Sequence, residues 1–188
     1  MNIITLSPEV LCRDNFVIRD QQILDIIRSV DPNEIFCNFL DESTDLINVT
    51  SSDPDLHQSG FLHLVTETVF DYPHNWISEK TWKPIVHLRP FVIAGPPGSL
   101  AQLRSLGFKT FSTWWDESYD EIQDPLLRMK SIIELLKKIC GHTLEDLIEI
   151  YNEMELTLQF NYDHYYGSFV NDSLDEFNKK CQENLLPR

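Results

Sequence analysis

The sequence has few basic residues for its size. Its 188 residues include 15 Lys and Arg against 30 Asp and Glu, a formal net charge of −15. Binding along a nucleic-acid phosphate backbone depends on clustered Lys and Arg, so this balance argues against a nucleic-acid partner. It equally disfavours an anionic membrane surface. A small anion can still bind where a few basic groups and backbone N–H groups converge.

Several motifs of catalytic and metal sites are also missing. The sequence contains no P-loop, GxGxxG, GxSxG or HExxH pattern, and its six histidines show no ligand spacing. These gaps exclude the common nucleotide, hydrolase and zinc signatures and predict no metal site. The four cysteines are scattered without a CxxC pair, and the first residues do not resemble a signal peptide. Both features predict reduced thiols in a cytoplasmic protein.

Long apolar runs are absent as well. No stretch of about 18 apolar residues occurs, which predicts that the chain does not span a membrane. Hydrophobic residues make up 42% of the sequence, enough for one ordinary domain with a core. Residues 1–60 are predicted to form a partly irregular N-terminal segment that packs on this core, with a helix over 21–30 and a buried strand over 34–40. Residues 61–188 are predicted to form the main domain.

Strand-like and helix-like segments alternate in the first half of the main domain. Apolar or β-branched strands are predicted over 61–70, 90–95 and 108–111. Helices are predicted between them, the first capped by Ser78 and the second capped by Ser99. This alternation implies parallel strands joined by right-handed crossovers. We therefore predict an α/β fold, built on a Rossmann-like parallel sheet and followed by a helical C-terminal region.

Pro84 complicates the first of these helices. It lies well inside a helix that starts after Ser78, where a proline removes a backbone hydrogen bond. Either the helix is kinked at Pro84, or it begins there, with Pro84 in the first helical position.

The helical C-terminal region follows an acidic and aromatic connector. Asp124 followed by Pro125 predicts the start of a long helix, and Thr143 with Asp146 forms a capping-box pattern for the next one. The connector is predicted to be a solvated acidic segment, with a hard-cation site as the alternative. Its acidic residues are Asp116, Glu117, Asp120 and Glu121.

The stretch from Trp76 to Gly98 holds the densest set of functional signals. Lys80 is predicted in the first turn of a helix, where the helix dipole disfavours a cation. An anion bound at that helix N-terminus would explain the placement, with Lys80 and free N–H groups holding a diphosphate. The alternative is a solvated surface lysine.

Other residues surround this predicted anion site. Glu79 is placed to accept hydrogen bonds from a ribose, and Glu67 lies at the end of a strand, where ligands bind in open α/β sheets. The glycine-containing loop after 90–95 can let the backbone approach a phosphate or a sugar. For each of these features an ordinary structural role is the alternative. The candidate donor-binding residues are Ser78, Glu79, Lys80, Thr81, Gly95 and Gly98.

A family resemblance covers residues 63–98, which read HLVTETVFDYPHNWISEKTWKPIVHLRPFVIAGPPG. This stretch resembles the donor-binding motif of α1,3-fucosyltransferase-like glycosyltransferases, as found also in phage and viral proteins. Glu67 matches the first acid of that motif, and Ser78-Glu79-Lys80 matches its Thr-Glu-Lys. Residues 89–96 match its final strand and loop, while Thr68-Val69 replaces the usual Asn-Ser.

The resemblance implies a GT-B fold, in which two Rossmann-like halves bind the acceptor and the donor. Residues 61–188 would be the C-terminal half, which binds a nucleotide-diphosphate sugar. The implied activity is transfer of that sugar with inversion at the anomeric carbon and without a separate cofactor. Lys80 would hold the diphosphate, with Glu67 and Glu79 near the ribose or sugar. Glu67 is the best available candidate for the catalytic general base, because it lies at the expected sugar end.

Only 60 residues precede Phe61, too few for a complete acceptor-binding half. We therefore expect a partner subunit or a second copy of the chain to complete the acceptor side, in the cytoplasm, or in the host cytoplasm if the protein is viral. Two alternatives stay open. One is a non-catalytic module that binds nucleotide sugars, and the other is an acidic interaction protein that blocks a host factor.

Overall fold

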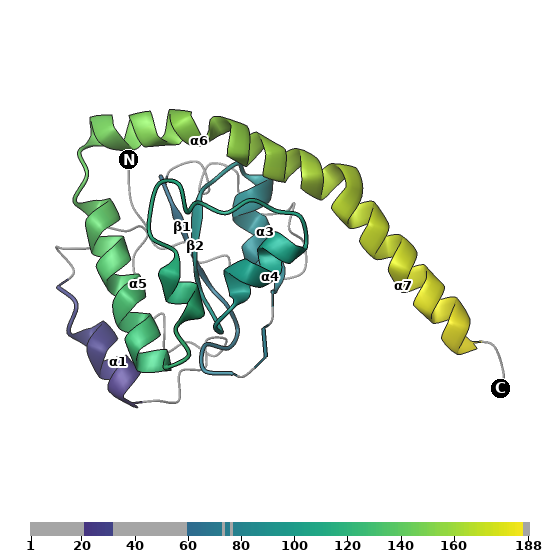
Figure 1. Cartoon of the computed structure of the whole chain (residues 1–188), viewed down its shortest axis with the longest axis horizontal. Coiled ribbons are helices and arrows are strands. Elements are labelled where there is room, and N and C mark those ends of the chain that lie inside the picture. Colours follow the sequence, from purple (N-terminus) through teal and green to yellow (C-terminus); the bar gives the residue numbers. More distant parts are fainter. Residues whose placement is uncertain (1–20, 32–59, 73, 76, 186–188) are drawn as a thin grey trace.

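The structure is a computed structural model that describes residues 21–31, 60–72, 74–75 and 77–185. Two parallel strands lie at its centre, with helices on both faces (Figure 1). The strands are β1 (His63–Thr66) and β2 (Phe91–Ala94). The helices are α1 (Gln21–Arg28), α3 (Glu79–Val86), α4 (Ser99–Ser105), α5 (Pro125–Cys140), α6 (Leu144–His164) and α7 (Val170–Leu185). A 3-10 helix, η1 (Ser118–Glu121), precedes α5, and a π-helical turn, η2 (Tyr165–Phe169), joins α6 to α7.

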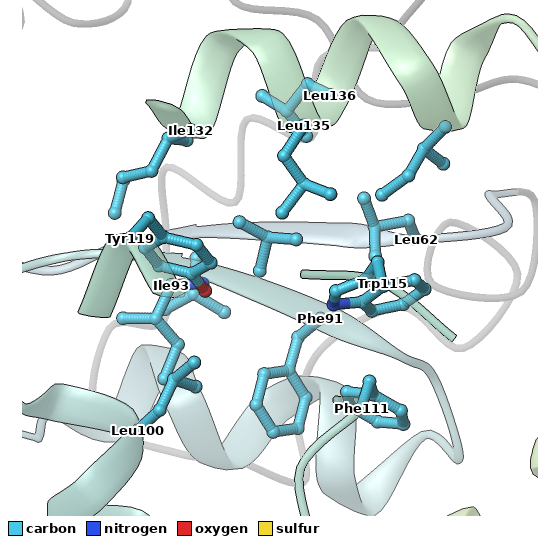
Figure 2. Close-up of a cluster of buried hydrophobic side chains, with 14 of the residues drawn as sticks. Leu62, Phe91, Ile93, Leu100, Phe111, Trp115, Tyr119, Ile132, Leu135 and Leu136 are labelled. Carbon is cyan, nitrogen blue, oxygen red and sulfur yellow. The ribbon is translucent and has the colours of Figure 1, made fainter. Parts of the chain in front are cut away.

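The two strands form the middle layer of the core. They pair in parallel, with His63 opposite Phe91 and Thr66 opposite Ala94. Every residue of β2 is buried, as expected for a strand that is covered by helices on both faces. Figure 2 shows side chains of α5 on one face of the sheet and of α4 and the following segment on the other; those labelled include Ile132, Leu135 and Leu136 against Leu100 and Phe111.

The predicted α/β class with parallel pairing is confirmed, but the described residues form a two-stranded sheet and not a complete Rossmann-like half. The strand predicted over 108–111 is wrong, because this segment pairs with neither strand. Side chains bind its backbone instead. Asn161 accepts a hydrogen bond from the Lys109 N–H at 2.8 Å and donates one to the Lys109 carbonyl at 2.9 Å. Glu117 accepts one from the Phe111 N–H at 2.7 Å.

The outer edge of β2 is occupied by a tyrosine. Tyr119 of η1 is 2% exposed, and its hydroxyl oxygen accepts a hydrogen bond from the Ile93 N–H at 3.2 Å. Burial raises the pKa of Tyr119 far above its ordinary value, so the hydroxyl stays neutral. A side chain therefore takes the place where another strand would pair with β2.

The predicted starts of α5 and α6 are confirmed. The Asp124 side chain accepts a hydrogen bond from the Leu127 N–H at 2.9 Å, and Pro125 is the first residue of α5. Thr143 and Asp146 form the complete capping box at the start of α6, with distances of 3.2 and 3.0 Å. Both starts could be predicted because a cap depends on residues within one turn of it.

The predicted starts of α3 and α4 are confirmed in part. Ser78 caps α3 as predicted, and the helix continues through Pro84. The alternative that α3 begins at Pro84 is therefore wrong. The N-cap of α4 is Gly98, one residue before the predicted Ser99.

The first helix and the last helix of the described residues differ in how they pack on the core. At the N-terminal side, α1 lies beside α5 and buries Ile23 and Ile27, whereas the strand predicted over 34–40 lies outside the described residues. At the C-terminal side, α6 crosses the core and α7 extends away from it (Figure 1). Within the part of the chain that the structure describes, no helix is long and apolar enough to cross a membrane.

Candidate functional site

The candidate site lies at the carboxyl ends of β1 and β2. Glu67 follows β1 and Gly95 follows β2, and the Glu67 N–H donates to the Ala94 carbonyl at 3.0 Å. The two positions are in close contact, because a Cβ added at Gly95 would lie 3.3 Å from the Glu67 side chain. In open α/β sheets this edge is where ligands bind.

Glu67 anchors the start of α3. Its carboxylate accepts hydrogen bonds from the Ser78 N–H at 3.1 Å and from the Thr81 hydroxyl at 2.6 Å. Glu67 and Thr81 are both 0% exposed. The Ser78 hydroxyl in turn accepts a hydrogen bond from the Lys80 N–H at 3.3 Å. Three of the residues predicted to contact a ligand therefore hold one another, and through α3 they position Lys80.

Lys80 presents its side chain to the same edge of the sheet. Its ammonium donates a hydrogen bond to the Thr68 hydroxyl at 3.1 Å, just past the end of β1. Among the described residues no carboxylate forms an ion pair with this ammonium. Glu79 is half-buried as the first residue of α3. A lysine that is held beside a strand end without a counter-ion can accept an anionic ligand.

A small cavity lies beside Thr68, the hydrogen-bond partner of Lys80. It has a volume of about 220 Å³, and Thr68, Val69, Tyr72, His74 and Asn75 line it. The Tyr72 and His74 rings meet edge to face at 5.8 Å between centroids.

Asn75 joins the cavity to the loop after β2. Its amide donates a hydrogen bond to the Gly98 carbonyl at 3.0 Å. Gly98 has a φ of +82°, and a Cβ there would lie 2.8 Å from the Asn75 amide nitrogen, so only glycine fits. Both predicted glycines, Gly95 and Gly98, thus border the site.

The N-terminus of α4 is already capped by a carboxylate from elsewhere in the chain. Asp120 of η1 is 3% exposed, and it accepts hydrogen bonds from the Leu100 and Ala101 N–H groups, both at 2.9 Å. Its carbonyl also accepts one from the Gly98 N–H at 2.7 Å. Asp120 thus occupies the start of α4, directly after the loop that the sequence predicted to approach a phosphate or a sugar.

A buried arginine lies beneath the site. The Arg128 guanidinium is 1% exposed and donates to the Phe70 carbonyl at 2.5 Å, in the segment after β1, and to the Gly95 carbonyl at 3.1 Å, directly after β2. It also donates to the carbonyls of Ile122 and Gln123, at 2.7 and 3.2 Å. Burial lowers the pKa of Arg128, while Asp120 acts in the opposite direction. Arg128 therefore joins both strand ends to the connector.

The sequence analysis did not identify Arg128 or Asp120 as part of the site. A signal for Arg128 exists, because it precedes Ile132, Leu135 and Ile139 at spacings that put all four on one face of α5. A charged residue in a buried stripe needs a partner. Asp120 lies among other acidic residues of the connector, and its spacing does not distinguish it from them.

The prediction of a solvated acidic connector is wrong for Glu117 and Asp120. Glu117 is 8% exposed, and its carboxylate accepts hydrogen bonds from the Thr110 hydroxyl at 2.7 Å and from Arg104 at 3.2 Å. Asp116 and Glu121 are exposed as predicted. In the described ranges no group of three His, Cys, Asp or Glu side chains is arranged to hold a metal ion.

The buried Glu117 carboxyl predicts a specific pH dependence. Burial raises its pKa above 4.5, although Thr110, the Phe111 N–H and Arg104 oppose this. The folded state therefore holds this proton more tightly than the unfolded state. The contribution of Glu117 to the free energy of unfolding should fall as the pH rises from 4.5 through the raised pKa.

Urea unfolding of wild type and Glu117→Gln across this pH range measures that contribution. We expect the stability difference, wild type minus variant, to decrease steadily with rising pH, because the variant lacks the titrating carboxyl. Glu121→Gln makes the same change from carboxylate to amide at an exposed position of the same connector and is the matched control. A constant difference for Glu117→Gln would contradict the raised pKa.

Comparisons with known proteins find no relative: no family model, curated protein or solved structure gives a significant match to the chain. The candidate site is therefore inferred from the structure of this chain alone. The fold brings Glu67, Ser78 and Thr81 into direct contact and places Lys80 beside them. Glu79, Gly95 and Gly98 lie at the same edge of the sheet.

Proposed function

We propose that the carboxyl edge of the sheet binds the diphosphate of a nucleotide sugar, and that the chain acts as the donor-binding half of a GT-B glycosyltransferase. The observation that carries this proposal is Lys80, whose ammonium is held at the strand ends with only the Thr68 hydroxyl as its partner among the described residues. An arginine or lysine that lies where ligands enter an α/β sheet is suited to a phosphate.

The Lys80 side chain is proposed to be the main anion-binding group. Several N–H groups at the two helix starts are already engaged, because the Ser78 N–H binds Glu67 and the Leu100 and Ala101 N–H groups bind Asp120. These internal carboxylates fix the two helix starts, so Lys80 needs little rearrangement to meet a diphosphate. Such preorganisation raises affinity because less ordering is required on binding.

The cavity beside Thr68 is proposed to take the nucleoside. Tyr72 lines this cavity and is 53% exposed, so its ring is accessible to a base. Asn75 and Thr68 offer polar groups for orientation, as ligand pockets usually do. This arrangement supports binding of the whole nucleotide over binding of inorganic phosphate alone.

The proposed reaction is displacement of the nucleoside diphosphate by an acceptor hydroxyl. The bond between the anomeric carbon and the diphosphate oxygen breaks, and Lys80 stabilises the negative charge that this oxygen gains. Glu67 is proposed as a positioning residue, because its carboxylate is fully buried and its partners are the N-cap and the first turn of α3. The base that removes the proton from the acceptor would then come from a partner subunit or a second copy.

Isothermal titration calorimetry with GDP, UDP and their sugar conjugates tests the proposal. We expect wild type to bind at least one of them, and Lys80→Ala to weaken that binding roughly 10- to 100-fold, the range for a lost charged hydrogen bond. Lys130→Ala is the matched control, since this exposed lysine lies on α5 away from the site and should bind as wild type does.

The possible outcomes separate the candidate functions. Binding with slow release of free sugar supports a transferase, and binding without any turnover supports a non-catalytic nucleotide-sugar module. If wild type binds none of these nucleotides, or if Lys80→Ala binds as well as Lys130→Ala, the donor site is refuted. The acidic interaction protein would then be the better account.

A further inference from the structure

A second cavity lies at the opposite end of β1. It has a volume of about 250 Å³, and its wall includes Phe61, which precedes β1, whereas Glu67 and Lys80 belong to the other end of the strand. The four residues of β1 alone span about 13 Å, so the two sites are separate. The turn after residue 111, α5 and α6 provide the rest of the wall.

Aromatic side chains form a large part of this wall. Phe61, Trp114 and Trp115 all line the cavity. The Trp114 ring is held in place, because its indole N–H donates a hydrogen bond to Glu153 of α6 at 3.0 Å. Trp115 is 9% exposed, and within the described part of the chain its buried indole N–H has no hydrogen-bond partner. Since that nitrogen is itself buried, Trp115 offers the cavity its ring and not its N–H group.

The rim of the cavity is polar and carries both signs of charge. Lys138 lies in the last turn of α5 and His142 follows this helix. Glu134 and Ser131 lie one to two turns before Lys138, and Asp116 lies opposite them in the turn after residue 111. Lys138 contributes to a lowered pKa of Asp116, after the larger effect of the Ser118 hydrogen bonds, so these two charges are near each other. The rim therefore offers both hydrogen-bond donors and acceptors.

The side chains around the cavity limit the chemical class of ligand that can bind there. A wholly apolar ligand would bury the rim charges without partners, which is unfavourable. A phosphate or other anion would meet Asp116 and Glu134, on a chain of net charge −15. A neutral ring with hydroxyl groups avoids both problems, because its C–H face packs on indole and its hydroxyls both donate and accept hydrogen bonds.

We propose that this cavity is a carbohydrate-binding site for one neutral sugar ring. The ring packs against Trp114, and its hydroxyls bind Asp116, Glu134 and Lys138. The site does not depend on the proposed donor site, because it shares no residue with the cavity beside Thr68.

Saturation-transfer NMR with five free sugars tests the site: glucose, galactose, mannose, N-acetylglucosamine and fucose. We expect wild type to bind at least one of them, and Trp114→Ala to weaken that binding about tenfold, the size of a lost ring contact. Tyr166→Ala removes an aromatic ring that is 44% exposed elsewhere and should bind as wild type does. Lys80→Ala should also keep sugar binding, which separates this site from the donor site.

Lys138→Ala is a second test variant that distinguishes loss of the binding site from loss of folding, since this exposed side chain can be removed without disturbing the core. It should weaken sugar binding while leaving the circular dichroism spectrum unchanged. Absence of binding by wild type to all five sugars overturns the proposal. Equal binding by wild type, Trp114→Ala and Lys138→Ala would overturn it as well, because the sugar would then lie elsewhere.

Discussion

Replacing Arg128 with methionine is expected to lower the free energy of unfolding by about 4 kcal/mol, the largest single effect that we predict. Methionine keeps much of the side-chain volume and loses all four hydrogen bonds. The carbonyls of Phe70 and Gly95 would then lie beside the core without their donor. Because these carbonyls lie in the segments that follow the two strands, the loss should also loosen the edge of the sheet that carries Lys80.

Urea denaturation followed by tryptophan fluorescence measures this effect. Lys130→Met, the same replacement at an exposed position of α5, is the matched control and should change stability by less than about 0.5 kcal/mol. Arg128→Lys should recover only a minor part, because one ammonium cannot reach four carbonyls in the geometry of a guanidinium. Equal stability of Arg128→Met and Lys130→Met would show that the buried network contributes nothing.

Replacing Asp120 with alanine is expected to cost about 3 kcal/mol. Two N–H groups in the first turn of α4, those of Leu100 and Ala101, would lose a charged acceptor. Arg104 would also lose a carboxylate that lies 3.9 Å from its guanidinium. Removing Asp120 therefore affects the start of α4 and the contact between α4 and η1 together.

The same urea experiment applies to Asp120→Ala, with Glu121→Ala as its neighbour control. Glu121 is exposed in the same 3-10 helix, so its removal should stay within about 0.5 kcal/mol of wild type. Asp120→Asn should fall between the two, because an amide retains one acceptor oxygen for two N–H groups. If Asp120→Ala unfolds at the same urea concentration as Glu121→Ala, the capping role is refuted.

The buried acids show why the connector could not be predicted from its composition. Glu117 directly follows the exposed Asp116, and Asp120 directly precedes the exposed Glu121. Each of the two carboxylates is buried because it accepts a hydrogen bond from a backbone N–H group elsewhere in the chain. The donor is Phe111 for Glu117, and the start of α4 for Asp120. Those partners are 6 to 20 residues away along the chain, so no local pattern identifies them.

The failed strand at 108–111 has a related cause. Its residues have the character of a strand, but its partners are side chains of Asn161 and Glu117, and Tyr119 binds the free edge of β2. A high strand propensity indicates that a segment suits an extended, half-buried surface. It does not indicate whether another strand or a side chain will form the hydrogen bonds with the backbone of that segment.

The sequence by itself determined the local features of this protein. The caps at Ser78, Asp124 and Thr143, and the parallel pairing of β1 with β2, follow from residues within a turn or from the order of elements. Only the tertiary structure decided that Glu67 holds α3 and that Asp120 and Arg128 organise the strand ends. The physical reason is that a buried charge needs partners, and distant parts of the chain supply them only once it has folded.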